Sequence, residues 1–277
     1  MGEKRLSINL NGYLMDLNIP KVMGILNITP DSFYSDSRKI SENDIHGRVI
    51  QMVEEGADII DIGGCSTRPG FTEPSLSEEW ERIDLGCRIV RKIAPHLPIS
   101  IDTFRAAVAV NAIERWNVEI VNDISGGKEK EIWDLAADKK IVYVLTHNRE
   151  NGIRPYSDIT ADVIKELSYK VNELHRKGVN DVIIDPGFGF AKTTEQNFRL
   201  FDELNEVVNM GYPVLVGISR KSMIYKTLNC NPEDALTGTI ALDAIALEKG
   251  ADILRVHDVK EAKETVELYS KLKNINV

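Results

Sequence analysis

Polar residues that could do chemistry stand at the ends of short apolar runs in this sequence. Each run closes on a carboxylate, amide, hydroxyl, imidazole or cation, and the full set is Asn27, Asp61, Asp102, Asn122 with Asp123, His147, Asp185, Ser219 with Arg220 and Lys221, and Arg255 with His257. Carboxylates, an amide and an ammonium group together offer alternating acceptors and donors. A flat heterocycle that carries amino, ring N–H and carbonyl groups would satisfy such a set.

The cations in this set predict an anion site beside the heterocycle. Arg255 and His257 are two residues apart and therefore share one face of a strand. A buried arginine without a partner is costly, so a structural salt bridge or an anionic ligand must accompany Arg255. With the N-terminal end of the helix that follows, Arg255 and His257 would form an anion site. Lys221 stands at a predicted helix start, where a cation opposes the helix dipole, so we expect it to face an anion or a carboxylate.

Each of these residues also has a simpler interpretation. Asp102 could cap the helix that follows it, and Asn122 with Asp123 could be turn residues. His147 alone would be structural, and the segment Asp185 to Phe190 could be only a tight turn that uses the freedom of glycine. The sequence shows no pair of a nucleophile and its base and no metal-ligand cluster. It therefore favours a template that holds a heterocycle beside a phosphorylated leaving group.

Eight apolar, β-branched runs supply the strands that would position these residues. They start near Lys21, Asp58, Pro98, Glu119, Ile141, Asp181, Pro213 and Asp252. Most are uniformly apolar, as parallel strands covered on both faces are. Between them lie helical patterns, one with a capping box at Ser41 and Asp44 before an apolar face of Ile45, Val49, Met52 and Val53, and one that starts at Asn231 to Asp234. Gly56, Gly178 and Gly250 each end a predicted helix just before a strand.

Eight alternations of strand and helix predict a closed (β/α)8 TIM barrel, an architecture of about 250 residues whose active site is built from the carboxyl ends of the strands. A doubly wound open sheet is the alternative. It would carry fewer strands and a glycine-rich first turn, and no G-x-G-x-x-G follows the first run. The dipeptide Asn11-Gly12 between alternating segments predicts a β-hairpin. We expect residues 1–20 to form an N-terminal hairpin cap on one domain that spans residues 1–277.

Composition limits the partners and the compartment. The net charge of −9 is spread through the chain, which argues against nucleic acid and against an anionic membrane surface as partners. Three widely separated cysteines without metal-binding spacing indicate reduced thiols. The N-terminus lacks the apolar stretch of a signal peptide, and no window reaches the roughly 18 apolar residues of a membrane span. The sequence predicts a soluble cytoplasmic protein.

Seven segments of the sequence carry a family resemblance. These are MGILNITPDSF, DIGGCSTRPG, SIDTFRAAVA, VNDISGG, DPGFGFAKT, GISRKSMI and RVHDV, which stand in order between Val22 and Val259. Together they resemble the dihydropteroate synthases of folate biosynthesis. The resemblance implies condensation of 6-hydroxymethyl-7,8-dihydropterin diphosphate with 4-aminobenzoate, which releases diphosphate and forms 7,8-dihydropteroate.

The resemblance also implies roles for individual residues. Pterin would be bound by Asp102, Asn122, Asp185 and Lys221; diphosphate by Asn27, Thr67, Arg255 and His257; and aminobenzoate by Thr67, Arg68, Pro69, Phe190 and Ser222. Asp102, Lys221 and Arg68 would act in catalysis, and Mg²⁺ would bind near Asn27. Sulfonamides would compete as mimics of aminobenzoate.

Two loops and the last helices complete the expectations. The segments from Thr29 to Arg38, with Asp31, Phe33 and Asp36, and from Ser66 to Pro74 are long, and we expect them to be mobile without ligand and to close over the barrel mouth. The last two helices carry apolar faces, and the family resemblance favours a homodimer over burial of those faces against the barrel.

Three residues depart from the commonest family pattern. Cys65 stands where Glu is common, and Thr146 and Asn148 stand where methionine is common. The residues that form the wall of the pterin pocket therefore do not follow from the resemblance.

Two other functions are the alternatives. A methyltetrahydrofolate methyltransferase would not need the diphosphate residues or the Ser-Thr-Arg-Pro-Gly loop. A non-catalytic pterin-binding paralogue would be expected to lack some of these residues.

Overall fold

The computed structural model describes residues 7–29, 41–65, 73–149 and 155–274. Eight parallel strands form one sheet in the order β8-β7-β6-β5-β4-β3-β10-β9. Their bounds are β3 Lys21–Asn27, β4 Ile59–Gly63, β5 Ile99–Asp102, β6 Ile120–Asp123, β7 Val142–Thr146, β8 Val182–Asp185, β9 Leu215–Val216 and β10 Ile253–Val256. A parallel bridge between Ile184 and Val214 joins β8 to the segment that leads into β9, so the sheet returns on itself. The predicted (β/α)8 barrel is confirmed, and the open doubly wound sheet is excluded.

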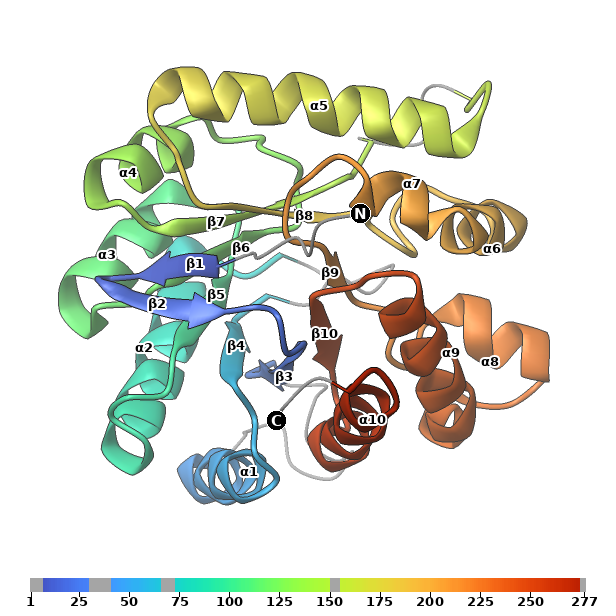
Figure 1. The fold of residues 1–277 in the computed structure, drawn as a ribbon. Helices are drawn as coiled ribbons and strands as arrows, with labels where there is room; N and C mark the ends of the chain where they lie inside the picture. Colours follow the sequence, from blue (N-terminus) through green and yellow to red (C-terminus); the bar gives the residue numbers. More distant parts are fainter. Residues whose placement is uncertain (1–6, 30–40, 66–72, 150–154, 275–277) are drawn as a thin grey trace.

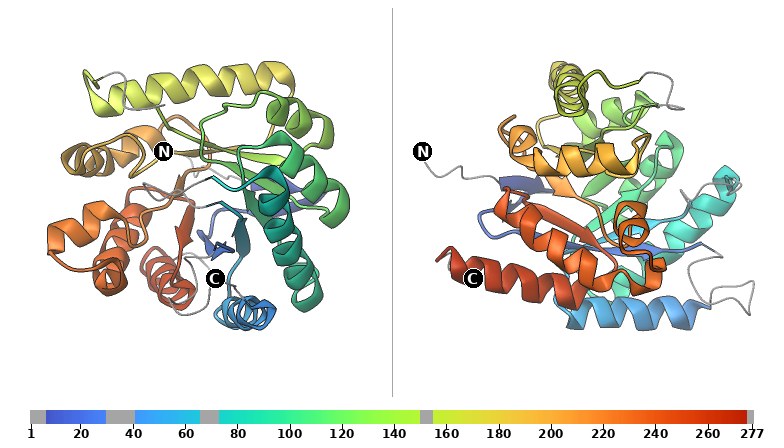
Figure 2. Two further views of the ribbon diagram at one scale, coloured as in Figure 1. Left: turned by 180° about the vertical axis from the view of Figure 1, so that it is seen from behind. Right: turned by 90° about the vertical axis from the view of Figure 1, so that its right-hand side faces the viewer.

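Helices surround the strands on the outside (Figures 1 and 2). Their bounds are α1 Glu42–Glu54, α2 Leu76–Ile93, α3 Ala106–Trp116, α4 Glu131–Lys139, α5 Ile159–Lys177, α6 Thr194–Asp202, α7 Leu204–Val208, α8 Ser222–Leu228, α9 Leu236–Glu248 and α10 Val259–Leu272. The capping box of α1 is present, because the Ser41 side chain accepts from the Asp44 backbone N–H at 3.1 Å. None of the helices in the described part of the chain is long and apolar enough to cross a membrane.

The predicted start at Asn231 to Asp234 has its cap residue, its first-turn proline and its two acids, but it opens a 3₁₀ turn in place of an α-helix. Pro232–Asp234 form a short 3₁₀ turn, η2, and α9 begins only at Leu236. The Arg220 guanidinium donates to the Glu233 carbonyl at 3.1 Å. This contact lies where the 3₁₀ turn ends and α9 begins.

Acidic residues at several predicted run starts lie just before the strands and not in them. Asp58, Glu119 and Asp252 each accept a backbone N–H from a neighbouring strand or its lead-in, at 2.8 Å from Val22, Ile99 and Val214. The same kind of bond links the barrel to the N-terminus, since Asp181 accepts from the Asn9 N–H at 3.0 Å. The side chains at this end therefore tie the strands together and carry no site chemistry.

The N-terminal hairpin closes this end of the barrel. It consists of β1 Ser7–Leu10 and β2 Tyr13–Asp16, joined by Asn11 and Gly12 at φ of 51° and 96°, as an Asn-Gly turn requires. The views in Figures 1 and 2 show the hairpin lying across one end of the strands. Its buried side chains form an inner core with the first residues of the strands, made of Ile8, Leu10, Met15, Leu17, Met23, Ile59, Ile120, Val142, Val144, Ile183, Leu215 and Ile253. The predicted hairpin cap is confirmed.

Polar side chains occupy the other half of the barrel interior. Residues two apart on a strand point to the same face, so Asp61 and Asn122 point inward with the inner-core residues Ile59 and Ile120. The residues between them, such as Ile60 and Ile62, pack outward against the helices. The alternation places an apolar plug at the hairpin end and a polar chamber at the carboxyl ends of the strands.

Candidate active site

Arg255 lies at the centre of the polar chamber and contacts two carboxylates. Its Nε donates to Asp61 Oδ2 and its Nη2 to Asp102 Oδ2, both at 2.7 Å. Asn122 Nδ2 donates to the same Asp61 oxygen at 3.1 Å. The salt bridge expected for a buried arginine is therefore present. Asp102 does not cap a helix, because α3 begins after Arg105 without a side-chain cap.

Around Arg255 the chamber carries an excess of negative charge. Burial raises the pKa of Asp102 to about 7, a shift that Arg255 opposes and that the Asp61 carboxylate reinforces. Among the described residues, Asp61 and Asp102 share the single Arg255 guanidinium, while Asp185 faces Lys221 and, more weakly, Lys192. The site can balance this excess with a proton on Asp102 or with positive charge on a ligand.

Several buried polar atoms in the chamber have no hydrogen-bond partner among the described residues. They are Asp61 Oδ1, Ser100 Oγ, Asn122 Oδ1 and Thr146 Oγ1. Buried polar groups are nearly always paired, because an unpaired one loses its hydration without compensation. Their concentration inside one half of the barrel indicates that this chamber receives a polar ligand.

Asp185 and Lys221 both contact the turn that follows β8. The Gly187 N–H donates to Asp185 Oδ1 at 2.7 Å. The Lys221 ammonium donates to the Phe188 carbonyl and lies 4.9 Å from the centre of the Phe190 ring. Burial raises the pKa of Asp185 and lowers that of Lys221 to about 8, and each charge opposes the shift of the other. The segment is thus both a tight turn and part of the chamber wall.

His257 is held as a neutral donor at the end of β10. Ser219 Oγ accepts the His257 backbone N–H at 3.2 Å and lies 3.1 Å from the Nδ1 atom of its ring. Where the Ser219 hydroxyl donates to Nδ1, the ring proton is on Nε2 and free of this contact. Burial and the neighbouring Arg255 lower the pKa of His257 to about 4. Arg48 of α1 donates to the His257 carbonyl and fixes its backbone.

Asn27 ends β3 beside Gly63, and its side-chain oxygen takes the space that glycine leaves. A Cβ atom on Gly63 would come within 2.9 Å of Asn27 Oδ1. No group of three or more histidine, cysteine, aspartate or glutamate side chains suited to a metal lies in the part of the chain that the structure describes. Asn27 would supply a single amide oxygen, so a Mg²⁺ ion here would take its other ligands from substrate phosphates and waters.

Several predicted site residues lie outside the described residues. These are Asp31, Phe33, Asp36, Thr67, Arg68 and Pro69, together with most of the two loops predicted to be mobile. The structure brings the remaining predicted residues to one chamber mouth, at the carboxyl ends of the strands: Asn27, Asp102, Asn122, Asp185, Phe190, Lys221, Ser222, Arg255 and His257. The interpretation of Asn122 as a turn residue is wrong, whereas Asp123 faces outward and accepts from Ser125 and Tyr143.

Three residues that depart from the family pattern can now be placed. Burial, reinforced by Glu79, raises the pKa of the Cys65 thiol to about 11, which makes it unreactive. Thr146 points into the chamber with an unpartnered hydroxyl, while Asn148 donates to the Ile124 carbonyl at 2.9 Å. Only Thr146 changes the wall of the chamber.

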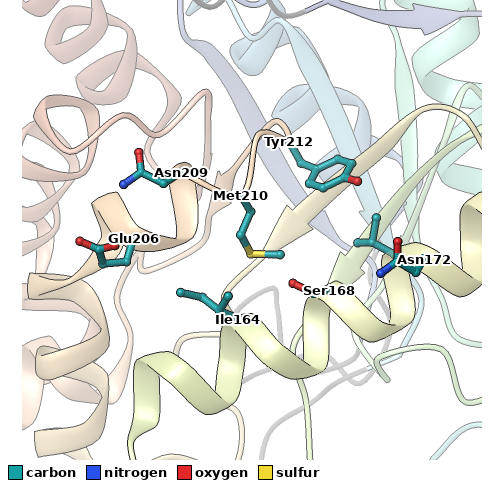
Figure 3. Close-up of a pocket in the computed structure, with 8 residues that line it drawn as sticks. Ile164, Ser168, Asn172, Glu206, Asn209, Met210 and Tyr212 are labelled. Carbon is teal, nitrogen blue, oxygen red and sulfur yellow. The ribbon is translucent and has the colours of Figure 1, made fainter. Parts of the chain in front are cut away.

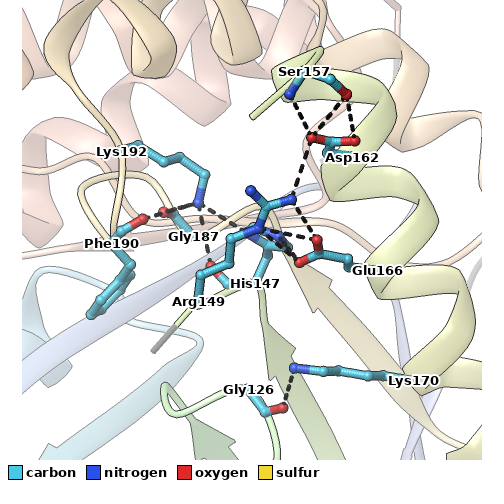
Figure 4. A network of polar contacts seen from close by, with 10 residues as sticks. All are labelled: Gly126, His147, Arg149, Ser157, Asp162, Glu166, Lys170, Gly187, Phe190 and Lys192. Atoms are coloured by element: carbon cyan, nitrogen blue, oxygen red, sulfur yellow. Dashed lines mark hydrogen bonds and ion pairs between the residues drawn. The ribbon is translucent and has the colours of Figure 1, made fainter. Parts of the chain in front are cut away.

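Sequence reasoning missed the functions of Asp61 and Lys192. Asp61 was recognised as a strand-end carboxylate without a role, yet it anchors Arg255 and Asn122. Asp61 stands two residues after Ile59, so both side chains point to the same face of the strand. This spacing could have identified Asp61 as an inward-facing residue. Lys192 belongs to a network around His147 (Figure 4), and no pattern in the sequence indicated that contact.

A surface cavity of about 470 Å³ lies apart from the chamber. It is formed by α5, α7 and the segment before β9, and Figure 3 shows its lining of Ile164, Ser168, Asn172, Glu206, Asn209, Met210 and Tyr212. No cation or buried acid lines this cavity within the described residues, so it does not compete with the chamber as an active site.

Comparisons with known proteins agree with this geometry. The family model described as pterin binding enzyme matches residues 23–257. A curated relative from Clostridium beijerinckii named dihydropteroate synthase is 42% identical over 247 residues, covering 87% of this chain and 89% of the relative.

Solved structures are similar as well. Dihydropteroate synthase from Xanthomonas albilineans with 4-aminobenzoic acid superposes with a TM-score of 0.91 at 32% identity, covering 98% of this chain and 100% of the other. The Yersinia pestis dihydropteroate synthase in complex with a sulfonamide drug gives a TM-score of 0.88 at 33% identity, with coverage of 98% and 100%. The chain belongs to the family of pterin-binding enzymes.

Proposed function

We propose that this chain is a dihydropteroate synthase, which joins 6-hydroxymethyl-7,8-dihydropterin diphosphate to 4-aminobenzoate and releases diphosphate. The observation that carries the proposal is the polar chamber, in which Asp185, Asn122 and Lys221 present acceptors and a donor at one barrel mouth. The names of the relatives and their match over most of the chain support it.

The pterin ring matches the hydrogen-bonding capacity of the chamber. The Asp185 carboxylate would accept from the 2-amino group and N3–H of the ring, because an ionised carboxylate only accepts. Asn122 would offer its unpartnered Oδ1 as a further acceptor. Lys221 would leave the Phe188 carbonyl and donate to the ring carbonyl. Binding thus satisfies atoms that are otherwise buried without partners.

The charge of the chamber supports a dissociative substitution. The bond between the pterin methylene and the diphosphate oxygen breaks, its electron pair leaves with diphosphate, and positive charge spreads from the methylene into the ring. The excess carboxylate charge, with Asp102 ionised, would stabilise that cation. The amine of 4-aminobenzoate then forms the new C–N bond with its lone pair and releases a proton. A neutral aromatic amine needs no strong base for this step.

The anion end of the site would hold the leaving group. The contacts of Arg255 with Asp61 and Asp102 use two of its five N–H donors, so others can reach the diphosphate. His257 would donate from Nε2, and Asn27 would supply one oxygen to Mg²⁺. When bound, the metal would neutralise charge on the diphosphate. Thr67 would belong to the same subsite.

The aminobenzoate site would lie above the turn after β8. Phe190 supplies an aromatic face beside Lys221, and Ser222 opens α8 next to it. Arg68 and Pro69 would complete the site, with Arg68 acting in catalysis. Sulfonamides would compete there, as the drug complex of the Yersinia pestis enzyme suggests.

We further propose a homodimer and a cytoplasmic location. Apolar side chains are exposed on α8, α9 and α10, at Leu228, Ile245, Leu268 and Leu272. Such a surface supports self-association. The cytoplasmic proposal rests on the three cysteines, none of which forms a disulfide.

The test of the proposed activity is release of diphosphate from the pterin diphosphate, with Mg²⁺ present and 4-aminobenzoate added or withheld. We expect release that depends on the amine and stops with a sulfonamide. A methyltransferase or a non-catalytic paralogue would release none, which would refute the proposal.

The dissociative step has its own test. Pterin diphosphate is labelled with ¹⁸O at the oxygen that joins the pterin methylene to the diphosphate. When it is incubated with the enzyme and a non-reacting aminobenzoate analogue, the label should move into the non-bridging positions of the same phosphate. Turnover of the true substrates without any scrambling under these conditions would favour a concerted attack instead.

A further inference from the structure

Lys192 is a partly buried lysine whose ammonium group binds backbone carbonyls of the turn after β8. Its Nζ donates to the Gly187 carbonyl at 2.9 Å and to the Phe190 carbonyl at 3.2 Å (Figure 4). Burial lowers the pKa of Lys192 to about 7, and the nearby Asp185 opposes that shift. Burial therefore removes the Lys192 ammonium group from water. This loss of hydration indicates that the side chain has a function.

The turn that Lys192 contacts carries two groups of the proposed site. Gly187, Gly189 and Ala191 all have left-handed backbones, at φ of 71°, 84° and 47°. This conformation is unfavourable for Ala191, which has a Cβ atom, so outside contacts must hold the turn. The Gly187 N–H fixes the Asp185 carboxylate, and the Phe188 carbonyl accepts from Lys221.

The ammonium groups of Lys192 and Lys221 thus bind different backbone carbonyls of the same turn. Lys221 binds the Phe188 carbonyl, and in the proposed function it leaves that oxygen when pterin binds. Lys192 binds the carbonyls of Gly187 and Phe190, which stand before and after Phe188 in the turn. Its two bonds can keep the turn in place while Lys221 moves.

His147 connects Lys192 to the outer layer. Lys192 Nζ lies 3.0 Å from His147 Nδ1, and an ammonium group can only donate, so Nδ1 accepts. The ring proton is then on Nε2, which donates to Glu166 Oε2 at 3.0 Å. Burial lowers the pKa of His147 to about 4, so the imidazole is neutral. Arg149 Nε holds the same Glu166 carboxylate at 3.0 Å from Oε1 (Figure 4).

We propose that Lys192 is a positioning residue for the pterin site, which holds the turn of residues 186–191 so that Asp185 and Phe190 stay oriented while Lys221 transfers to the substrate. The Glu166–His147 pair fixes Lys192 from α5. This role rests on the proposed function, because it needs pterin as the ligand that displaces Lys221.

The test compares two lysine variants. Lys192→Met removes the positioning ammonium, and Lys170→Met is the matched control, because Lys170 also donates to a glycine carbonyl, Gly126 O at 2.6 Å, in the same region (Figure 4). Calorimetry with 6-hydroxymethylpterin and steady-state kinetics with both substrates give the readout. We expect Lys192→Met to weaken pterin binding about 10- to 100-fold, and Lys170→Met to change it by about twofold at most.

Chemical rescue separates the charge from the packing. Lys192→Cys treated with 2-bromoethylamine gains a side chain of nearly lysine length with an amine at its end. We expect this treatment to restore pterin affinity, while the same treatment of the wild-type chain controls for reaction at Cys65, Cys87 and Cys230.

A measurement on the wild-type chain does not depend on any variant folding. Nitrogen NMR at pH 6 should show His147 as the neutral tautomer with its proton on Nε2. A proton on Nδ1 would mean that Lys192 does not donate there, and it would overturn the proposal.

The kinetic outcomes are equally decisive. Equal effects of Lys192→Met and Lys170→Met on pterin binding, or failure of the amine to rescue, would show that Lys192 is only structural. If the wild-type chain itself neither binds pterin nor releases diphosphate, the proposed function fails instead, so the two failures are distinguishable.

Discussion

At the scale of single residues, the site is organised by a shared cation. Arg255 bridges Asp61 and Asp102 at 2.7 Å each, so two carboxylates share one cation at this point. A pterin that becomes positive as diphosphate departs would complete this balance. The charge of the resting chamber therefore anticipates the charge of the transition state, which is how preorganised sites lower barriers.

Asp185→Asn tests the acceptor role of this carboxylate. The amide would place an N–H₂ donor against the donors of the ring, so we expect pterin affinity to fall about 100-fold. Calorimetry with 6-hydroxymethylpterin measures the change. Asp123→Asn is the matched control, since Asp123 is also buried but faces outward toward Tyr143. A similar loss in both variants would remove Asp185 from its role.

The pH dependence of kcat/KM should be bell-shaped. Asp102 has a raised pKa of about 7 and must be ionised to stabilise the cation, so activity should rise as the pH passes upward through about 7. Lys192 and Lys221 have lowered pKa values of about 7 and about 8, and both must be protonated to donate, so activity should fall as the pH rises through this range. Asp102→Asn should lose the acidic limb only. A wild-type profile that is flat between pH 6 and 9 would contradict both assignments.

At the scale of elements, the carboxyl end of each strand was predictable and its partners were not. Apolar runs showed where strands end, because parallel strands are covered on both faces. Which side chains meet at these strand ends depends on the tertiary structure. Arg255 and Asp61 are 194 residues apart, and the closure of the barrel alone brings them together. The contact of Lys192 with His147 was hidden for the same reason, as was the 3₁₀ turn before α9.

The turn after β8 should not tolerate a side chain at Gly187. A Cβ atom there would collide with the His147 carbonyl oxygen, in addition to the cost of a positive φ. Gly211 has a positive φ as well, but its Cβ position has no neighbour within 4 Å. We expect Gly187→Ala to abolish pterin binding and Gly211→Ala to cost only about 1–2 kcal/mol of stability. Calorimetry and urea unfolding measure the two, and equal behaviour would refute the close approach.

The hairpin should contribute stability without contributing to the site. Ile8→Ala removes a side chain from the inner core, so we expect unfolding in urea to lose about 2–5 kcal/mol. Leu14→Ala, on the exposed side of the same hairpin, should change it by about 0.5 kcal/mol or less. The KM for pterin diphosphate should be unchanged in both. An altered KM in Ile8→Ala would mean that the hairpin end is coupled to the chamber.

At the scale of the whole molecule, the barrel and its cap followed from periodicity, but the composition of the chamber did not. Eight strand–helix units and an Asn-Gly turn are local signals, and the structure contains them. The inward or outward direction of Asn122 and Asp123 depends on the register of β6 within the closed sheet, which no local signal fixes. That is why one of two adjacent polar residues belongs to the site.

The one-domain prediction concerns the whole chain. Since the hairpin and the strands share one inner core, we expect a single unfolding transition seen alike by tryptophan fluorescence and by circular dichroism. Separate transitions would indicate that the hairpin and barrel unfold as independent units.

The measurement that tests the account most directly is a structure of the chain with 6-hydroxymethylpterin bound. The ring should lie in the barrel chamber, with its donors on Asp185 and Asn122 and its carbonyl on Lys221, whose ammonium has left the Phe188 oxygen. A ring bound elsewhere, such as in the cavity between α5 and α7, or Lys221 still on Phe188 beside a bound ring, would contradict it.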